Sequence, residues 1–156
     1  MRTQPGGPAS YTDPMDCPRG HGELVVEYHK GIEVDHCPVC NGRWLDIHEL
    51  DELEALGAPD PGDRRGMIDY AKRPSELNCP VCGKRMTAFN YRANPLELDM
   101  CEEEHGYWLD AGEEGRVQDL IEQRVRDLYR AASAEESWGQ FLSGMRGIKG
   151  KFGRRR

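Results

Sequence analysis

Eight cysteine and histidine side chains in this sequence have the spacing of metal ligands. The first set comprises Cys17, His21, Cys37 and Cys40, and the second comprises Cys79, Cys82, Cys101 and His105. Each set offers three thiolates and one imidazole, which is a combination that zinc binds tetrahedrally. A full set of four protein ligands leaves no open position for water, so the sequence predicts two structural Zn²⁺ ions per chain.

The two sets differ in a complementary way. The first opens with Cys17-x-x-x-His21 and closes with a Cys-x-x-Cys pair, whereas the second opens with Cys-x-x-Cys and closes with Cys101-x-x-x-His105. In both, the histidine comes one residue later than the cysteine that it replaces, because a longer side chain needs a wider loop to put its nitrogen about 2.0–2.1 Å from the metal. Two substitutions that each restore four ligands favour metal binding over free thiols.

Other ligands and metals are alternatives. His29 or His36 could complete the first set in place of His21, although only His21 stands where the matching cysteine would be. In the second set, Glu104 could offer an oxygen beside His105. Iron in a site of the rubredoxin type is the alternative metal, and the histidines count against it.

The cysteines could also form three disulfides in an oxidising compartment. However, residues 1–14 contain no apolar core of the kind that a signal peptide requires. No run of 18 apolar residues occurs that could span a membrane. We therefore expect a cytoplasmic protein with reduced thiols.

The ligands lie in a unit that occurs twice. Residues 33–46 and 97–110 match at a constant offset, with a cysteine seven positions before a tryptophan, a glycine two before it and an aspartate two after it. A repeat of this length indicates a repeated fold unit. Units of about 40 residues bury little core and depend on disulfides or metal for stability. We expect Trp44 and Trp108 to cover the metal knuckles, with stacking on nucleic-acid bases as the alternative.

Each unit has the pattern of a β-hairpin followed by a helix. In the first, short β-rich runs flank a turn near Gly31, and Asp46 with Glu49 forms a capping box for a helix that stops at Gly57. In the second, strands at 86–91 and 96–100 precede a longer helix capped by Asp110. The apolar face of that helix is expected to pack on the ribbons or to self-associate; it comprises Val117, Leu120, Ile121, Val125, Leu128, Tyr129 and Ala132.

The sequence thus predicts a small metal-stabilised α+β fold of two tandem zinc ribbons with a C-terminal amphipathic basic segment. The predicted divisions are a disordered lead-in at 1–14, ribbon one at 15–56, a linker at 57–76, ribbon two at 77–132 and the tail at 133–156.

At CPVCNGRWLDIHEL and at CPVCG…C…HGYWLDAGE, the sequence resembles the TFIIB-type zinc ribbon, a transcription factor zinc-finger family common in bacterial proteins. The resemblance covers residues 15–54 and 77–118, and it implies a zinc-ribbon fold. It also implies six zinc ligands, which are Cys17, Cys37, Cys40, Cys79, Cys82 and Cys101. His21 and His105 depart from the four-cysteine pattern of that family, so their assignment as ligands depends on spacing alone.

The charge is distributed unevenly. Residues 1–136 carry 15 basic and 28 acidic side chains, whereas residues 137–156 carry six basic side chains and no acidic one. The candidate polyanion-binding residues are Arg146, Lys149, Lys151, Arg154, Arg155 and Arg156. A capping box at Ser133 and the later glycines predict a tail that is helical to about Gly144 and disordered beyond.

These patterns favour a non-enzymatic adaptor, because we find neither an open metal position nor a nucleophile–base pair. The acidic ribbons would contact a protein of the transcription or translation machinery, and the basic tail would contact nucleic acid. A zinc-thiolate redox sensor is one alternative. A peripheral protein that binds an anionic membrane surface through its tail is another.

Overall fold

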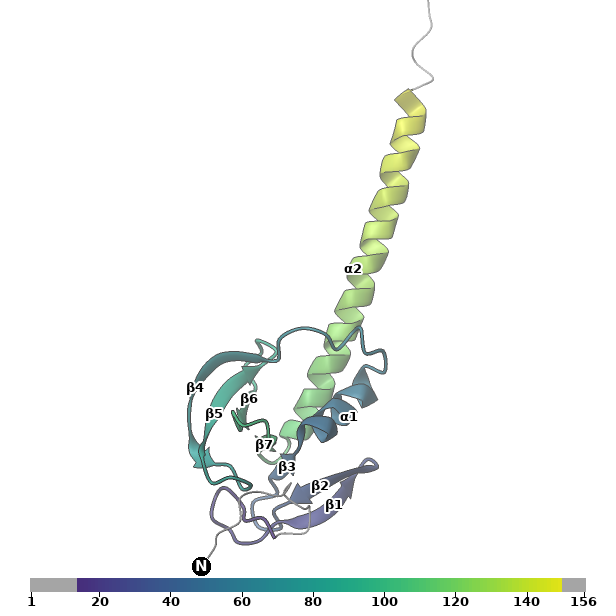
Figure 1. Ribbon diagram of the computed structural model, residues 1–156. Coiled ribbons are helices and arrows are strands. Elements are labelled where there is room, and N and C mark those ends of the chain that lie inside the picture. The colour runs from purple at the N-terminus through teal and green to yellow at the C-terminus, as the bar shows by residue number, and fades with distance from the viewer. Residues whose placement is uncertain (1–13, 150–156) are drawn as a thin grey trace, which may run out of the picture.

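The computed structural model describes residues 14–149, in which seven strands form one antiparallel sheet with two helices (Figure 1). The strands are β1 (Val25–His29), β2 (Ile32–His36), β3 (Arg43–Leu45), β4 (Asp69–Asn78), β5 (Arg85–Tyr91), β6 (Glu97–Met100) and β7 (Tyr107–Leu109). The helices are α1 (Ile47–Gly57) and α2 (Glu113–Lys149). The strand order is β1-β2-β3-β7-β6-β5-β4. None of the helices within 14–149 has the length and apolarity needed to cross a bilayer.

The two copies of the repeat meet at the centre of this sheet. Strand β3 pairs antiparallel with β7, and Trp44 lies directly opposite Trp108. The flanking pairs are Arg43 with Leu109 and Leu45 with Tyr107. In each pair, the residue before one tryptophan lies opposite the residue after the other tryptophan. The tryptophan motif therefore joins the two halves through a local two-fold relation between their backbones.

The same relation extends outward from the junction. Asp35 pairs with Trp44 as Asp99 pairs with Trp108. The predicted hairpins are present as β1–β2 and β5–β6, and their registers match residue for residue where both are paired. The one difference in length is at the tips, where the second hairpin has two additional residues.

Side chains that alternate along the central strands divide the core into two layers. Leu45 and Leu109 point toward the helices and pack with Leu53 and Val117 in one apolar cluster. The neighbouring tryptophans point to the opposite face, where they pack with the cysteines. Because the strand period is two, one Trp-Leu pair in each half supplies both layers.

Helix α1 begins as the sequence predicts. The Asp46 side chain accepts a hydrogen bond from the Glu49 backbone N–H at 2.8 Å, and the Glu49 carboxylate accepts one from the Asp46 N–H at 2.7 Å. In the second half, Glu113 accepts from the Asp110 N–H at 2.7 Å, but the Asp110 carboxylate accepts from Trp108 and Arg19. The capping box is thus reciprocal in α1, and in α2 the aspartate side chain has another role.

Helix α2 is continuous over Glu113–Lys149, so the separate tail segment predicted to start at Ser133 is not observed. The Ser133 hydroxyl donates to the Tyr129 carbonyl at 2.9 Å within the helix. Neighbouring alanine, glutamate and glutamine residues favour helix and outweigh the cost of the glycines. Its first turns pack on α1 and the sheet, and the rest projects away from the body (Figure 1). The predicted apolar face is therefore covered at Val117 and Ile121 and exposed at Leu128 and Tyr129.

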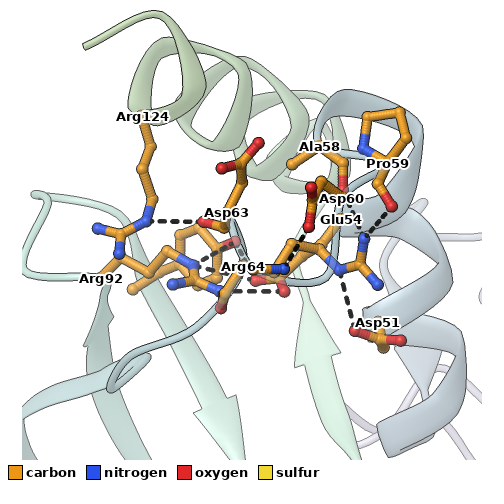
Figure 2. A network of polar contacts seen from close by, with 11 residues as sticks. Asp51, Glu54, Ala58, Pro59, Asp60, Asp63, Arg64, Arg92 and Arg124 are labelled. Carbon is orange, nitrogen blue, oxygen red and sulfur yellow. Dashed lines mark hydrogen bonds and ion pairs between the residues drawn. The ribbon is translucent and has the colours of Figure 1, made fainter. Parts of the chain in front are cut away.

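The segment predicted as a linker, residues 57–76, is ordered by contacts with the rest of the protein. Strand β4 occupies its second part, where a polar sequence fits an edge strand that is largely exposed. Its first part is held by arginines (Figure 2). Arg64 donates to the Pro59 carbonyl at 3.1 Å and to Asp51 at 3.2 Å, and Arg124 of α2 donates to the Arg65 carbonyl at 2.8 Å.

The tip of each hairpin contacts the helix of the other half. Arg92, beside the tip of the second hairpin, donates to both carboxylate oxygens of Glu54 in α1 at 3.2 and 3.1 Å, and the Tyr91 hydroxyl donates to the same carboxylate (Figure 2). Lys30, at the tip of the first hairpin, donates to the Gln118 side chain in α2. Glu54 and Gln118 occupy equivalent positions in the repeat, so the two halves cross over each other.

Candidate metal centres

The structure brings the first four predicted ligands together between two turns of the first half. Cys17 and His21 precede β1, and Cys37 and Cys40 lie between β2 and β3. The Cys17 Sγ atom is 3.7 Å from His21 Nδ1 and 3.8 Å from Cys40 Sγ. The Cys37 Sγ atom is 4.0 Å from the same Nδ1.

The second four predicted ligands form an equivalent group in the second half. The Cys101 Sγ atom is 3.4 Å from His105 Nδ1 and 3.7 Å from Cys82 Sγ. The Cys79 Sγ atom is 3.9 Å from the His105 nitrogen. In both groups the imidazole presents Nδ1, and all four ligand atoms lie within 4.8 Å of one another.

These separations fit a tetrahedral zinc ion. Bonds of about 2.3 Å to sulfur and about 2.0–2.1 Å to nitrogen put tetrahedral ligand atoms about 3.5–3.8 Å apart. The ligand–ligand distances above, from 3.4 to 4.0 Å, cluster around these values. Each group could therefore hold one metal ion.

The electrostatics of the site favour protonated sulfur at Cys40 and Cys79 unless a cation is bound. Burial raises the pKa of Cys40 to about 11 and the pKa of Cys79 to about 12, and neighbouring sulfurs add to both shifts. Burial acts in the same sense on Cys37, but the backbone N–H groups of Cys40 and Val39 outweigh it and lower the pKa of Cys37 to about 7. Three thiolates can be held this close at neutral pH only with a compensating positive charge.

Backbone hydrogen bonds shape the four turns that carry the ligands. The N–H of the first cysteine in each turn donates to a carbonyl five residues later, at 2.7 Å for Cys17, 2.9 Å for Cys37, 2.8 Å for Cys79 and 3.0 Å for Cys101. Glu104, the alternative oxygen ligand, has a φ of 61° at the bend of its turn and lies outside the ligand group.

The competing histidines of the first half lie elsewhere. His36 Nε2 is 3.3 Å from Asn41 Oδ1, and its Nδ1 is 3.6 Å from the Glu27 carboxylate. His29 belongs to β1 on the helix-facing side of the sheet. Of the three histidines considered for this half, His21 is the one that lies in the ligand group.

A shared aromatic layer connects the two ligand groups. Trp44 and Trp108 are 2% and 0% exposed, and they pack in one cluster with four of the six cysteines. Burial of both rings fits the prediction that they cover the knuckles. It leaves no exposed face on which a nucleic-acid base could stack.

Two glycines of the repeat make this packing possible. A Cβ atom on Gly42 would lie 2.2 Å from the Trp108 ring, and a Cβ atom on Gly106 would lie 2.3 Å from the Leu45 carbonyl oxygen and 3.0 Å from the Trp44 ring. Each half thus uses its glycine to admit the tryptophan of the other half.

One connection between the ligand groups was missed by the sequence analysis. Arg19, in the first cysteine turn, donates two hydrogen bonds of 2.6 Å to the Asp110 carboxylate, which also accepts from the Trp108 Nε1–H at 3.0 Å. Burial alone would raise the pKa of Asp110, but the hydrogen bonds from Arg19 and Trp108 and the charge of Arg19 together outweigh it and lower this pKa. The available signal was the aspartate two positions after each tryptophan, but nothing in the sequence pairs it with an arginine 91 residues away.

The polyanion-binding prediction lies largely outside the described residues. Arg146 and Lys149 belong to the last turns of α2, but their side chains are not among those the structure describes. Lys151, Arg154, Arg155 and Arg156 lie beyond residue 149, and most of the predicted lead-in, residues 1–13, lies before residue 14. The structure leaves these predictions as they were.

Comparison with known protein families gives a match within the first half of the chain. A family model described as a transcription factor zinc-finger, of the TFIIB zinc-ribbon type, matches residues 16–55. The matched range contains the first ligand group and α1 up to its last turn. The same comparison does not extend to the second group. Searches among curated proteins and among solved structures find no match.

Proposed function

We propose that this protein is a zinc-stabilised adaptor without enzymatic activity, built from two copies of a TFIIB-type ribbon. The observation that carries this proposal is the pair of four-ligand groups, in which each metal ion would be fully coordinated by protein. Such coordination supports folding and leaves no position at which a metal could bind substrate or water. The match to a transcription factor zinc-finger model supports the proposal that this protein associates with nucleic acid or with the transcription machinery.

The charge distribution supports two separate partner surfaces. The body is acidic, whereas the last twenty residues are basic. Helix α2 carries its own last turns, up to Lys149, away from the sheet, so an anionic partner bound there would lie apart from the acidic body (Figure 1). Near the end of the helix, exposed apolar side chains at helical spacing widen this surface; they are Trp138, Phe141, Leu142 and Met145. We assign nucleic acid to the basic end and a protein of the transcription or translation machinery to the acidic body.

Affinity purification of the tagged full chain from its own cells tests this assignment. We expect nucleic acid and a protein component to co-purify, nuclease to remove the first, and a variant that ends at residue 136 to lose it. The log of the affinity for RNA or DNA should fall linearly with log salt concentration. A chain that binds neither nucleic acid nor protein contradicts the adaptor function, and binding to anionic vesicles instead would favour a membrane-surface protein.

A zinc-thiolate redox sensor is the second candidate, because the Cys82 thiol is exposed while four of the six cysteines are buried. Oxidation of an accessible metal-bound thiolate would release zinc and unfold the surrounding turn. Zinc release on mild peroxide treatment, reversed by a thiol reductant, would support this function. Unchanged zinc content under the same treatment would exclude it.

A further inference from the structure

The two edges of the sheet are built differently. Strand β4 forms one edge, and it contains Pro74, the cations Lys72 and Arg73, and two register shifts against β5. Proline, charge and irregularity are the features by which natural edge strands avoid pairing with other chains. Strand β1 forms the other edge and has neither proline nor a register shift, and its one acidic side chain, Glu27, lies beside Arg43. Its five residues, Val25–His29, pair with β2 in an unbroken register.

Strand β1 also exposes apolar side chains. Val26 is 61% exposed and Tyr28 is 70% exposed on the face that carries the tryptophans, and Val25 is 47% exposed on the other face. Within residues 14–149, β1 has a strand on one side only. An exposed, regular and apolar edge strand is a template for the addition of another strand.

The second half of the molecule shows how such an edge is covered. Strand β5, the counterpart of β1, lies between β6 and β4. From β4, Arg73 forms an ion pair with Glu97 of β6, and the buried Ser75 brings its hydroxyl group close to Asp99 of β6. Strand β4 therefore supplies a cation and a hydroxyl group to two carboxylates that lie across β5.

The counterparts of those carboxylates on β2 are Glu33 and Asp35. Glu33 accepts a hydrogen bond from the Tyr28 hydroxyl at 3.0 Å. Asp35 is half-buried and lies on the same face of β2 as Glu33, between Val26 and Trp44 in the sheet. The first half thus presents the same acidic pattern as the second, and no strand within residues 14–149 brings a cation to it.

We propose that β1 is a strand-addition site for an extended segment of a partner protein that carries basic and hydroxyl side chains. The segment pairs antiparallel with β1, as β4 pairs with β5, and its basic side chains reach across β1 toward the acidic side chains of β2. Apolar contact with Val26 and Tyr28 adds to the backbone hydrogen bonds. The proposal rests on the adaptor function and assigns the surface at which its protein partner binds.

The test uses the zinc-loaded full chain and a short synthetic peptide of alternating valine and lysine residues. We expect the peptide to shift the backbone amide NMR signals of β1 and β2 while those of α2 stay in place. A peptide in which glutamate replaces lysine should not bind. Replacing Val26 and Tyr28 with lysine (Val26→Lys, Tyr28→Lys) should weaken binding by about tenfold or more, because lysines on an edge repel a basic strand.

Tyr129→Lys is the matched control, because Tyr129 is 62% exposed on α2, outside the sheet and away from both ligand groups. Its binding should equal that of the wild type. The proposal is overturned if the shifts fall outside β1 and β2 or if the double lysine variant binds equally well. It is also overturned if the peptide binds only after removal of residues 1–13, since this chain would then cover its own edge. The proposal is overturned as well if the wild-type chain forms a dimer that Val26→Lys, Tyr28→Lys abolishes, since β1 would then pair with a second copy of this chain.

Failure here is distinguishable from failure of the adaptor function. Loss of peptide binding at β1 would leave zinc content and the nucleic-acid affinity of the basic end unchanged. Conversely, a chain that binds the peptide at β1 but recovers no nucleic acid from cells keeps this site and loses the assignment of its basic end.

Discussion

Two regions of the molecule occupy equivalent places in the sheet and have opposite chemistry. In the second half, Phe89, Tyr91 and Tyr107 pack with Leu50 of α1, and the Phe89 and Tyr107 rings meet edge to face with centroids 6.0 Å apart. The four equivalent positions in the first half are Glu27, His29, Arg43 and, in α2, Glu114. The same backbone arrangement therefore supports an apolar contact in the second half and a polar contact in the first half.

The polar contact is only partly satisfied. Arg43 donates to Glu114 at 2.8 Å and lies 3.3 Å from Glu27. Four buried polar atoms of this group lack a hydrogen-bond partner among the described residues: Glu27 Oε2, His29 Nε2, Arg43 Nε and Glu114 Oε2. Buried polar atoms without partners cost free energy. The comparison indicates that the second half anchors the fold and that the first half opens more readily.

Removal of zinc should have the largest effect on this comparison. Wild-type protein should contain about two zinc ions, and His21→Ala and His105→Ala should each lower the content to about one. Structural zinc contributes about 10–16 kcal/mol to folding in small peptides, so a chelator should unfold both halves. Metal analysis and circular dichroism measure these outcomes. A wild-type content near one, or no response to either substitution, would contradict the ligand assignment.

After loss of one zinc ion, the halves should behave differently. In His21→Ala the first hairpin should lose amide exchange protection while β5 and β6 keep it, because their apolar contact persists. In His105→Ala both halves should lose protection, because β7 supports β3. Equal protection patterns in the two variants would show that the halves do not differ in stability.

The contacts from the hairpin tips should differ by several kcal/mol. Arg92→Met leaves the buried Glu54 carboxylate without its cation, and loss of one partner of a buried ion pair costs about 3–5 kcal/mol. Lys30→Met removes the equivalent contact, but Lys30 is exposed and its partner Gln118 is uncharged, so loss of this hydrogen bond costs about 1 kcal/mol. Urea unfolding of both variants measures the difference. Similar losses would show that the crossing contacts are equivalent.

The central glycines should be intolerant of a side chain in both halves. Gly42→Ala and Gly106→Ala force an added carbon against the opposing Trp-Leu segment, and overpacking of this kind costs about 1–3 kcal/mol. Gly139→Ala is the control, because open space surrounds that position in α2 and alanine stabilises a helix by about 1 kcal/mol over glycine. A neutral result at Gly42 would contradict the close approach of the two halves.

The pH dependence should show the smallest effect. Burial raises the pKa values of Glu49 and Glu113, at equivalent positions, to about 7. The folded state then holds protons that the unfolded state releases near pH 4.5, so their contribution to stability is full below pH 4.5 and is lost as the pH rises to 7. Glu49→Gln and Glu113→Gln should each reduce this loss when the zinc-loaded variants are melted at several pH values from about 5 to 7.

His29 gives the opposite sign, and only the first half has it. Burial lowers its pKa, with the Arg43 charge adding to the shift, so the unfolded state binds the proton more readily. Its contribution is present above the unfolded value, near 6.5, and is lost as the pH falls below it. His29→Phe should remove this loss. An unchanged pH profile in that variant would show that His29 does not titrate differently on unfolding.

Much of the local structure follows from local sequence signals. The hairpin turn at Gly31, the capping box at Asp46 and the helix end at Gly57 each depend on residues a few positions apart, and the structure has them where they are predicted. The eight candidate ligands were predicted because the repeat lines up their residue types, and the structure brings them together in two groups of four. The β3–β7 junction was not predicted, because a repeat shows that two units are alike and does not show how they pack.

Strand β4 was missed for a related reason. Its sequence is polar and contains Pro74, which is typical of a loop, yet Pro74 lies on an outer edge and the charged side chains pair with neighbours such as Asp69 and Glu97. The continuity of α2 past Ser133 was also missed, because a capping-box pattern inside a helix looks like a helix start. In each case, tertiary context decided between two local preferences.

The pairing of Trp44 with Trp108 has a consequence for the origin and assembly of the fold. A chain with one half alone would expose β3, and an edge that pairs with its own equivalent forms an isologous dimer about a two-fold axis. Joining the halves in one polypeptide converts that association into an intramolecular one, with an effective concentration on the order of millimolar. Assembly then no longer depends on protein concentration. The two halves can also diverge in sequence, because the interface between them no longer has to be self-complementary, as it must be in a symmetric dimer.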